Sequence, residues 1–138
     1  MAPRRAATRP ASPADARAYL AKAEEFLQAA ADSLGHGNFV ATAGNAVHAG
    51  IAAADAVSAA RAGVVWTGEH AQAAGHVEKV GGADGRQVGR QLRQLLPLKN
   101  RAEYDPAPTS EGEARSAHRA AERSVAVAWR AVEPAPRR

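Results

Sequence analysis

Small residues dominate a long helical pattern in the middle of the chain, between Asn38 and Gly63. The apolar residues of this segment recur at spacings of three and four, which indicates a helix with one continuous apolar face. That face contains Val40, Ala43, Val47, Ile51, Ala54 and Val57. Because many of the positions on and beside this face are alanine or glycine, a neighbouring helix can approach closely and make dispersion contacts along the backbone. We therefore expect a helical fold in which this segment packs tightly against a partner helix.

Two further long segments begin with clear helix-start signals. Ser12 and Pro13 supply an N-cap residue and a proline at the first helical position. Ser110 and Glu113 have the spacing of a capping box, in which each residue satisfies a free backbone N–H of the first turn. Apolar residues continue at helical spacing after both signals. The first predicted helix spans about residues 13–34. The last begins at the cap of Ser110, continues through Val132 and is ended by Pro134.

The region between Gly63 and Ser110 is expected to hold one short helix and one more long helix. The stretch "EHAQAAGHVEKV", residues 69–80, has a helical pattern that ends at a pair of glycines. Asp84 with Gln87 resembles a capping box and would open the next helix. Pro97 lies inside that helix and is expected to kink or split it, because proline lacks the N–H that an interior turn needs. The residues of this helix predicted to face the core are Val88, Leu92, Leu95 and Leu96.

No segment shows the alternation of apolar and polar residues that is typical of a strand. The sequence therefore predicts an all-α fold, an up-and-down bundle of four long helices plus one short helix. A chain of 138 residues is long enough for one hydrophobic core. We expect one helical domain, flanked by a disordered basic N-terminal tail and a C-terminal tail. The expected ranges are residues 1–12, 13–133 and 134–138.

The net charge of +4 suggests an affinity for nucleic acid, but much of the excess lies at the two ends of the chain. The basic residues there are Arg4, Arg5, Arg9, Arg137 and Arg138. Without these five, 13 basic residues stand against 14 acidic ones, so the predicted domain is close to neutral. The basic ends would add weak, salt-sensitive contacts to phosphate, or they only keep an alanine-rich chain in solution.

Several classes of site are excluded by composition and spacing. The chain has no cysteine, so disulfides and thiolate chemistry are absent. Its five histidines form neither an HExxH motif nor a pair spaced by four, and its glycines lack the GK[ST] of a phosphate loop. We expect no metal and no cofactor. No apolar run reaches the roughly 20 residues that span a bilayer, and the N-terminus lacks the apolar core of a signal peptide. We therefore expect a cytoplasmic protein that does not enter a membrane.

Three polar residues of the alanine-rich segment form a first candidate site. Asn45, His48 and Asp55 are spaced so that all three lie along one side of the helix. This arrangement would let the three side chains reach a shared cleft. The alternative is that they are polar residues at a helix boundary, hydrogen-bonded to neighbours or to water.

The stretch "LLPLKNRAEYDP" forms a second candidate site. A straight helix would point Lys99 into the middle of the apolar face, where an unpaired ammonium is rarely buried. Lys99 therefore implies a carboxylate, a cleft or a partner surface opposite it, and Glu103, Asp55 or a bound phosphate would each serve. If Pro97 resets the helical phase, Lys99 points to water instead. Arg101 and Asp105 would then form an exposed i, i+4 pair.

Three stretches of the sequence together resemble the HEPN superfamily of small helical domains, and most closely its actinobacterial members. They are "AVHAGIAAADAV", "GEHAQAAGHV" and "LLPLKNRAEYDP", and the resemblance covers roughly residues 13–132. It implies an up-and-down helical bundle that forms a homodimer. Many members are metal-independent ribonucleases, often toxins paired with a nucleotidyltransferase-like antitoxin. The resemblance thus implies an action on RNA or a nucleotide, in a toxin–antitoxin or defence system.

The family's active site is an arginine with a polar follower and, four to six residues later, a histidine. Here Lys99 and Asn100 stand in place of the first two, Arg101 follows them, and Tyr104 lies near the place of the histidine. Tyrosine is a poor base near neutral pH, and a catalytic member of this kind would take its proton carrier from outside the motif, with His48 or His70 as the candidates. The residues expected to carry catalysis are Lys99, Asn100, Arg101, Tyr104 and His48, and those expected to bind ligand are Asn45, Asp55, His70 and Glu103.

Two other functions fit the same residues. The first is a non-catalytic module that binds RNA or a nucleotide through the same polar cluster, which would explain the missing histidine. The second is a helical dimerisation or adaptor domain, in which the small residues allow helices of two subunits to pack closely.

Overall fold

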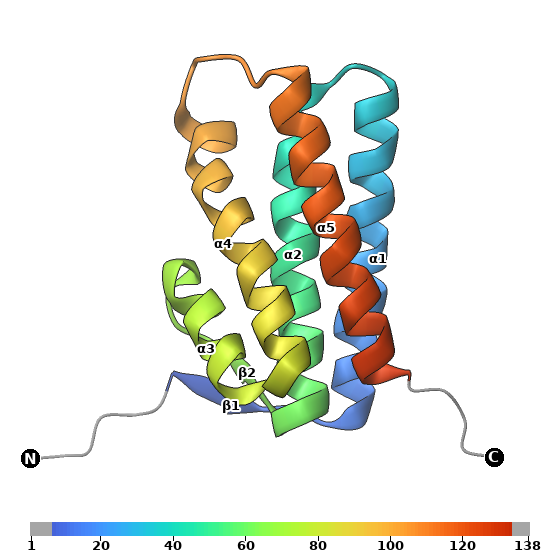
Figure 1. Cartoon of the computed structure of the whole chain (residues 1–138), viewed down its shortest axis with the longest axis vertical. Coiled ribbons are helices and arrows are strands. Elements are labelled where there is room, and N and C mark those ends of the chain that lie inside the picture. Colours follow the sequence, from blue (N-terminus) through green and yellow to red (C-terminus); the bar gives the residue numbers. More distant parts are fainter. Residues whose placement is uncertain (1–6, 134–138) are drawn as a thin grey trace, which may run out of the picture.

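Four long helices run side by side along the longest axis of the molecule (Figure 1). The structure is a computed structural model that describes residues 7–133. Its long helices are α1 (Pro13–Gly35), α2 (Phe39–Ala62), α4 (Gly82–Tyr104) and α5 (Glu111–Val132). A 3₁₀ turn, η1 (His70–Gln72), leads into the short helix α3 (Ala73–Val80). The predicted all-α bundle of four long helices and one short helix is therefore confirmed for the described part of the chain.

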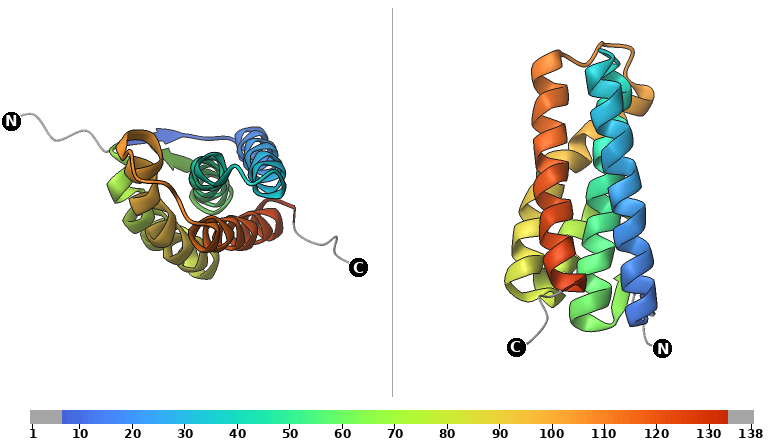
Figure 2. Two further views of the ribbon diagram at one scale, coloured as in Figure 1. Left: turned by 90° about the horizontal axis from the view of Figure 1, so that it is seen from above. Right: turned by 90° about the vertical axis from the view of Figure 1, so that its right-hand side faces the viewer.

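Helix α2 lies at the centre of the bundle and contacts α1, α4 and α5 (Figure 2). Its buried residues are mostly alanine, as the sequence pattern predicts, and the other helices approach its backbone closely. A Cβ atom added to Gly50 would lie 2.5 Å from the Cδ1 of Leu95, a fully buried residue of α4. The small residues of α2 thus let the long side chains of the surrounding helices fill the core.

Two short strands precede and follow the first helical hairpin. Strand β1 (Thr8–Pro10) pairs antiparallel with β2 (Val64–Trp66), and Arg9 lies opposite Val65. The expectation of no strand is wrong for these segments, and ordered structure begins before residue 13. Strands of three residues are too short to show an alternating pattern in the sequence. Of the two predicted tails, residues 1–6 and 134–138 lie outside the described residues.

The two serine caps form as the sequence predicts. Ser12 Oγ accepts a hydrogen bond from Asp15 N at 3.0 Å, and the Asp15 carboxylate accepts one from Ser12 N at 2.9 Å. Ser110 and Glu113 make the equivalent capping box at the start of α5. These caps fix the points at which α1 and α5 begin, because each satisfies backbone N–H groups that the first turn leaves free.

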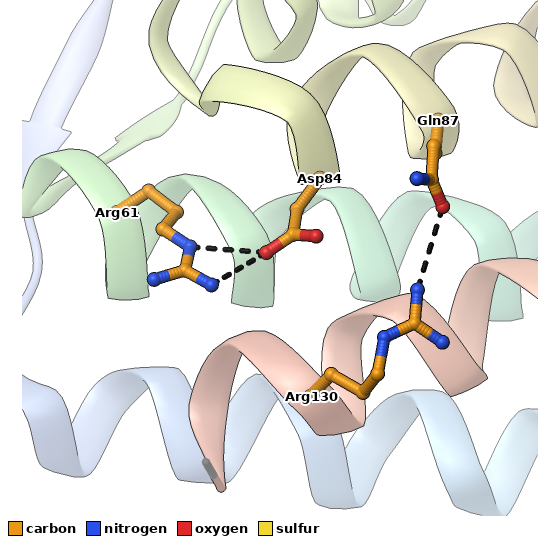
Figure 3. Close-up of polar contacts among 4 residues, drawn as sticks. All are labelled: Arg61, Asp84, Gln87 and Arg130. Atoms are coloured by element: carbon orange, nitrogen blue, oxygen red, sulfur yellow. Dashed lines mark hydrogen bonds and ion pairs between the residues drawn. The ribbon is translucent and has the colours of Figure 1, made fainter.

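The predicted cap at Asp84 is wrong. Helix α4 begins earlier, after Gly81, and has no side-chain cap. The Asp84 carboxylate instead accepts two hydrogen bonds from Arg61 of α2, at 2.5 and 3.1 Å, and Gln87 lies against Arg130 of α5 (Figure 3). Both polar side chains of the proposed box therefore tie α4 to its neighbours.

Pro97 does not split α4, which continues through it to Tyr104. Lys99 therefore lies within the same continuous helix as Val88, Leu92 and Leu95. Within residues 7–133, no helix has the length and apolar character needed to cross a membrane.

Candidate functional site

Lys99 lies at a groove between α4 and the segment that leads into α3. The groove has a volume of about 520 Å³. Its apolar residues are Ala71, Ala74, Leu96 and Pro97, and its polar residues are His70, Arg93, Lys99 and Asn100. We call this the α3–α4 groove. It combines apolar lining residues with a few polar groups, which is the usual make-up of a small-ligand site.

The Lys99 side chain is partly buried, with 26% of its surface exposed. Its Nζ lies 3.6 Å from Glu103 Oε2, one turn further along α4. Of the two carboxylates predicted as partners of Lys99, Glu103 is therefore the one that lies beside it. A single carboxylate at this distance leaves donors of the ammonium free, since lysine has three.

Arg93 is the second cation of the groove, and its partner is on α3. The guanidinium contacts Glu78 through three hydrogen bonds of 2.5 to 3.2 Å. These bonds lower the pKa of Glu78 and raise the pKa of Arg93. The pair joins α3 to α4 beside the groove. Arg93 and Asn100 are seven residues apart on one helical face, a spacing by which the sequence could have revealed Arg93.

Arg101 and Tyr104 lie outside the α3–α4 groove. Arg101 forms an ion pair with Glu113 of α5, and this contact, together with bonds from Ser110, lowers the pKa of Glu113 to about 2. The alternative pair of Arg101 with Asp105 is not formed; the Asp105 carboxylate accepts a hydrogen bond from the backbone N–H of Ala107 at 2.9 Å. Tyr104, at the end of α4, is 76% exposed.

Asn45, His48 and Asp55 lie on one side of α2, as predicted, but that side faces away from α4. At 100° per residue, the three residues lie roughly 140° to 160° around the helix from Gly50, which packs against Leu95 of α4. The His48 ring stacks on Phe26 of α1, with ring centroids 5.1 Å apart. The candidate site in α2 is therefore separate from Lys99, and Asp55 is not the partner of Lys99.

Asp55 has an unusual environment on this face of α2. Burial raises the pKa of its carboxyl to about 7, although the positive charges of Lys22 and Arg9 act in the opposite direction. Within residues 7–133, no hydrogen bond to its side chain is formed. Arg9 donates instead to Tyr19 Oη at 2.6 Å. Asp55 is thus a partly buried acid whose charge is poorly compensated.

A serine–histidine pair outside the groove has a structural role. Ser58 Oγ donates to the carbonyl oxygen of Val64 at 2.6 Å and lies 2.9 Å from His76 Nε2. Because its proton is held by a backbone carbonyl, the Ser58 hydroxyl is not poised as a nucleophile. Burial, together with the nearby charge of Lys79, lowers the pKa of His76. The pair connects α2, β2 and α3, and so helps to position the short helix beside α4.

Compared with protein-family models and with curated proteins, this chain matches none of them. Across residues 7–133, no group of three His, Asp or Glu side chains is arranged to hold a metal ion.

Proposed function

We propose that this chain is a HEPN-like domain that binds RNA or a nucleotide in the α3–α4 groove, as a homodimer and in a toxin–antitoxin or defence system. The observation that supports the proposal is that Lys99, Asn100 and His70 line one groove together with apolar residues. Two of these residues come from the motif at the end of α4, and the third comes from the turn before α3.

Each part of the groove suits one part of a nucleotide. Lys99 supplies a cation for a phosphate, and the Asn100 amide can donate to and accept from the edge of a base. Leu96 and Pro97 offer an apolar surface for the face of the base. A volume of about 520 Å³ lies within the roughly 300–1,000 Å³ range of small-ligand pockets and accommodates one nucleotide.

Lys99→Ala is expected to weaken binding of a short single-stranded RNA about tenfold, because it removes a desolvated charge at the phosphate. The logarithmic salt dependence of binding should fall by about 0.7, the value for one phosphate contact on a single strand. Fluorescence anisotropy with a labelled RNA at several salt concentrations measures both quantities.

The matched control is Arg17→Ala, which removes one positive charge from the exposed side of α1. It should leave affinity and salt dependence close to those of the parent chain. Equal losses in the two variants would show that binding depends only on net charge and would contradict a site at Lys99.

RNA cleavage is a second candidate activity, favoured by the position of His70. Cleavage through the 2′-hydroxyl needs a group that takes its proton, a group that protonates the leaving 5′-oxygen, and a cation that stabilises the phosphorane. His70 lines the groove with Lys99 and Asn100, whereas His48 stacks on α1. In a homodimer, the second copy of His70 would supply the second proton carrier.

His70→Ala is expected to lower metal-independent cleavage of RNA about a hundredfold, the lower end of the usual effect of losing a general acid or base. The rate is measured on a labelled RNA in the presence of a chelator. His48→Ala is the control and should cleave at the parent rate. RNA that stays intact with the parent chain across a range of pH would rule out this activity and leave the binding proposal standing.

A further inference from the structure

A second groove lies between α4 and α5 and is lined by three arginines. Its volume is about 410 Å³. Its residues are Gln87, Arg90 and Gln91 from α4, and Arg123, Ala126, Val127 and Arg130 from α5. We call this the α4–α5 groove. None of these residues lines the α3–α4 groove, so the two sites are separate.

The spacing of two of the arginines explains why they line the same groove. Arg123 and Arg130 are seven residues apart, so they lie two turns apart on the same face of α5. That face packs beside α4, and Arg130 reaches across to donate a hydrogen bond to Gln87 Oε1 at 3.4 Å (Figure 3). A neutral amide oxygen accepts this bond but does not balance the charge of the guanidinium.

The charge of the groove is not compensated by the described part of the chain. Within residues 7–133, none of Arg90, Arg123 and Arg130 forms an ion pair, whereas Arg61, Arg93, Arg101 and Arg115 each do. The carboxylate near Arg90 is already engaged: Arg90 helps to lower the pKa of Glu78, but Glu78 forms its ion pair with Arg93. Three like charges at one groove favour a bound anion.

Gln91, which lines the groove, also carries an unsatisfied side-chain atom. Gln91 Oε1 is buried and accepts no hydrogen bond, and within residues 7–133 it is the buried side-chain polar atom left without a partner. Buried carbonyl oxygens are nearly always satisfied, so this one calls for a donor. A phosphate has no donor to offer when fully ionised, but a ribose hydroxyl has one.

We infer that the α4–α5 groove binds the sugar-phosphate chain of RNA. The three arginines contact phosphate oxygens, and the Gln91 amide, whose oxygen is buried in the unliganded chain, turns into the groove to accept from a ribose hydroxyl. Arginine suits this role because its planar fork matches the geometry of phosphate oxygens. Binding here needs neither Lys99 nor His70, and the inference is therefore independent of the function proposed for the α3–α4 groove.

Arg123→Gln tests the inference in the full chain, with Arg115→Gln as the matched control. Both variants remove one positive charge from α5, but Arg115 is paired with Glu111 and lines neither groove. With a labelled single-stranded RNA, Arg123→Gln is expected to weaken binding about fivefold and to reduce the logarithmic salt dependence by about 0.7. Arg115→Gln should change neither quantity. Thermal unfolding of both variants shows whether each is folded.

Equal affinities and salt dependences for the two folded variants would overturn the inference. If Lys99→Ala weakens binding and Arg123→Gln does not, the α4–α5 groove is excluded while the function proposed above survives. If only Arg123→Gln weakens binding, the α4–α5 groove is supported and RNA binding in the α3–α4 groove is excluded.

Competition experiments identify the ligand. Unlabelled RNA should compete better than a free nucleoside triphosphate and far better than poly-glutamate. Poly-glutamate that competes as well as RNA would show a general acidic-polymer site and would overturn the assignment to RNA. Gln91→Leu should reduce the preference for RNA over DNA of the same sequence. An unchanged preference in a folded Gln91→Leu variant would contradict the contact with a ribose hydroxyl.

Discussion

Asp55→Asn is expected to stabilise the protein by about 4 kcal/mol at pH 8 and to have little effect at pH 4. Burial raises the pKa of Asp55 in the folded chain to about 7, against an ordinary value of 3.8. Between these values the folded state binds a proton that the unfolded state has released, so stability falls as the pH rises. Each pKa unit corresponds to about 1.4 kcal/mol, and the cost is complete above pH 7. Asparagine avoids this cost because it stays neutral.

Urea unfolding of the parent chain and of Asp55→Asn at pH 4, 6 and 8 measures this effect. The difference between their free energies of unfolding should grow as the pH rises. The comparison is needed because Asp15, Glu78 and Glu113 have lowered pKa values, and their contribution to stability is instead lost as the pH falls. The control is Asp32→Asn, which replaces an exposed carboxylate on α1. A difference for Asp55→Asn that is the same at all three pH values would contradict an elevated pKa.

The sequence places Asp55 on the correct side of α2 but beside the wrong neighbour. Helical periodicity fixes which residues share a face, and Asn45, His48 and Asp55 do share one. Periodicity does not say which helix covers that face, because several arrangements of the same helices bury equally apolar surfaces. The face turned out to pack against α1, where His48 meets Phe26. The i, i+4 pair of Lys99 and Glu103 was predictable because it depends on one helix alone.

The same division between local and distant contacts runs through the fold. The caps at Ser12 and Ser110 involve residues three apart, and both form. The box at Asp84 fails because Arg61, 23 residues away, takes the carboxylate. The pairing of β1 with β2 joins segments more than 50 residues apart and leaves no pattern in either. The arginines of the α4–α5 groove likewise come together only when α4 and α5 pack.

Gly85→Ala is expected to destabilise the protein by about 3 kcal/mol or more. Helix α3 lies so close to the first turns of α4 that a Cβ atom at Gly85 would be 2.1 Å from the carbonyl oxygen of Val77. The obstacle is backbone, which cannot move aside as a flexible side chain can, so the two helices would have to separate. Overpacking of a rigid contact usually costs about 1–3 kcal/mol and occasionally more. Urea unfolding of the parent chain and the variant measures the loss.

Gly44→Ala is the matched control, because a Cβ atom there meets nothing within 4 Å. Glycine inside a helix costs about 0.5–1 kcal/mol relative to alanine, so this variant should be more stable than the parent chain. The opposite signs of the two glycine variants follow from the backbone contact between α3 and α4 at Gly85. If that contact also sets the α3–α4 groove, Gly85→Ala should weaken RNA binding under conditions where it remains folded, because His70 would shift relative to Lys99. A Gly85→Ala variant as stable as the parent chain would show that α3 does not pack against α4 in this way.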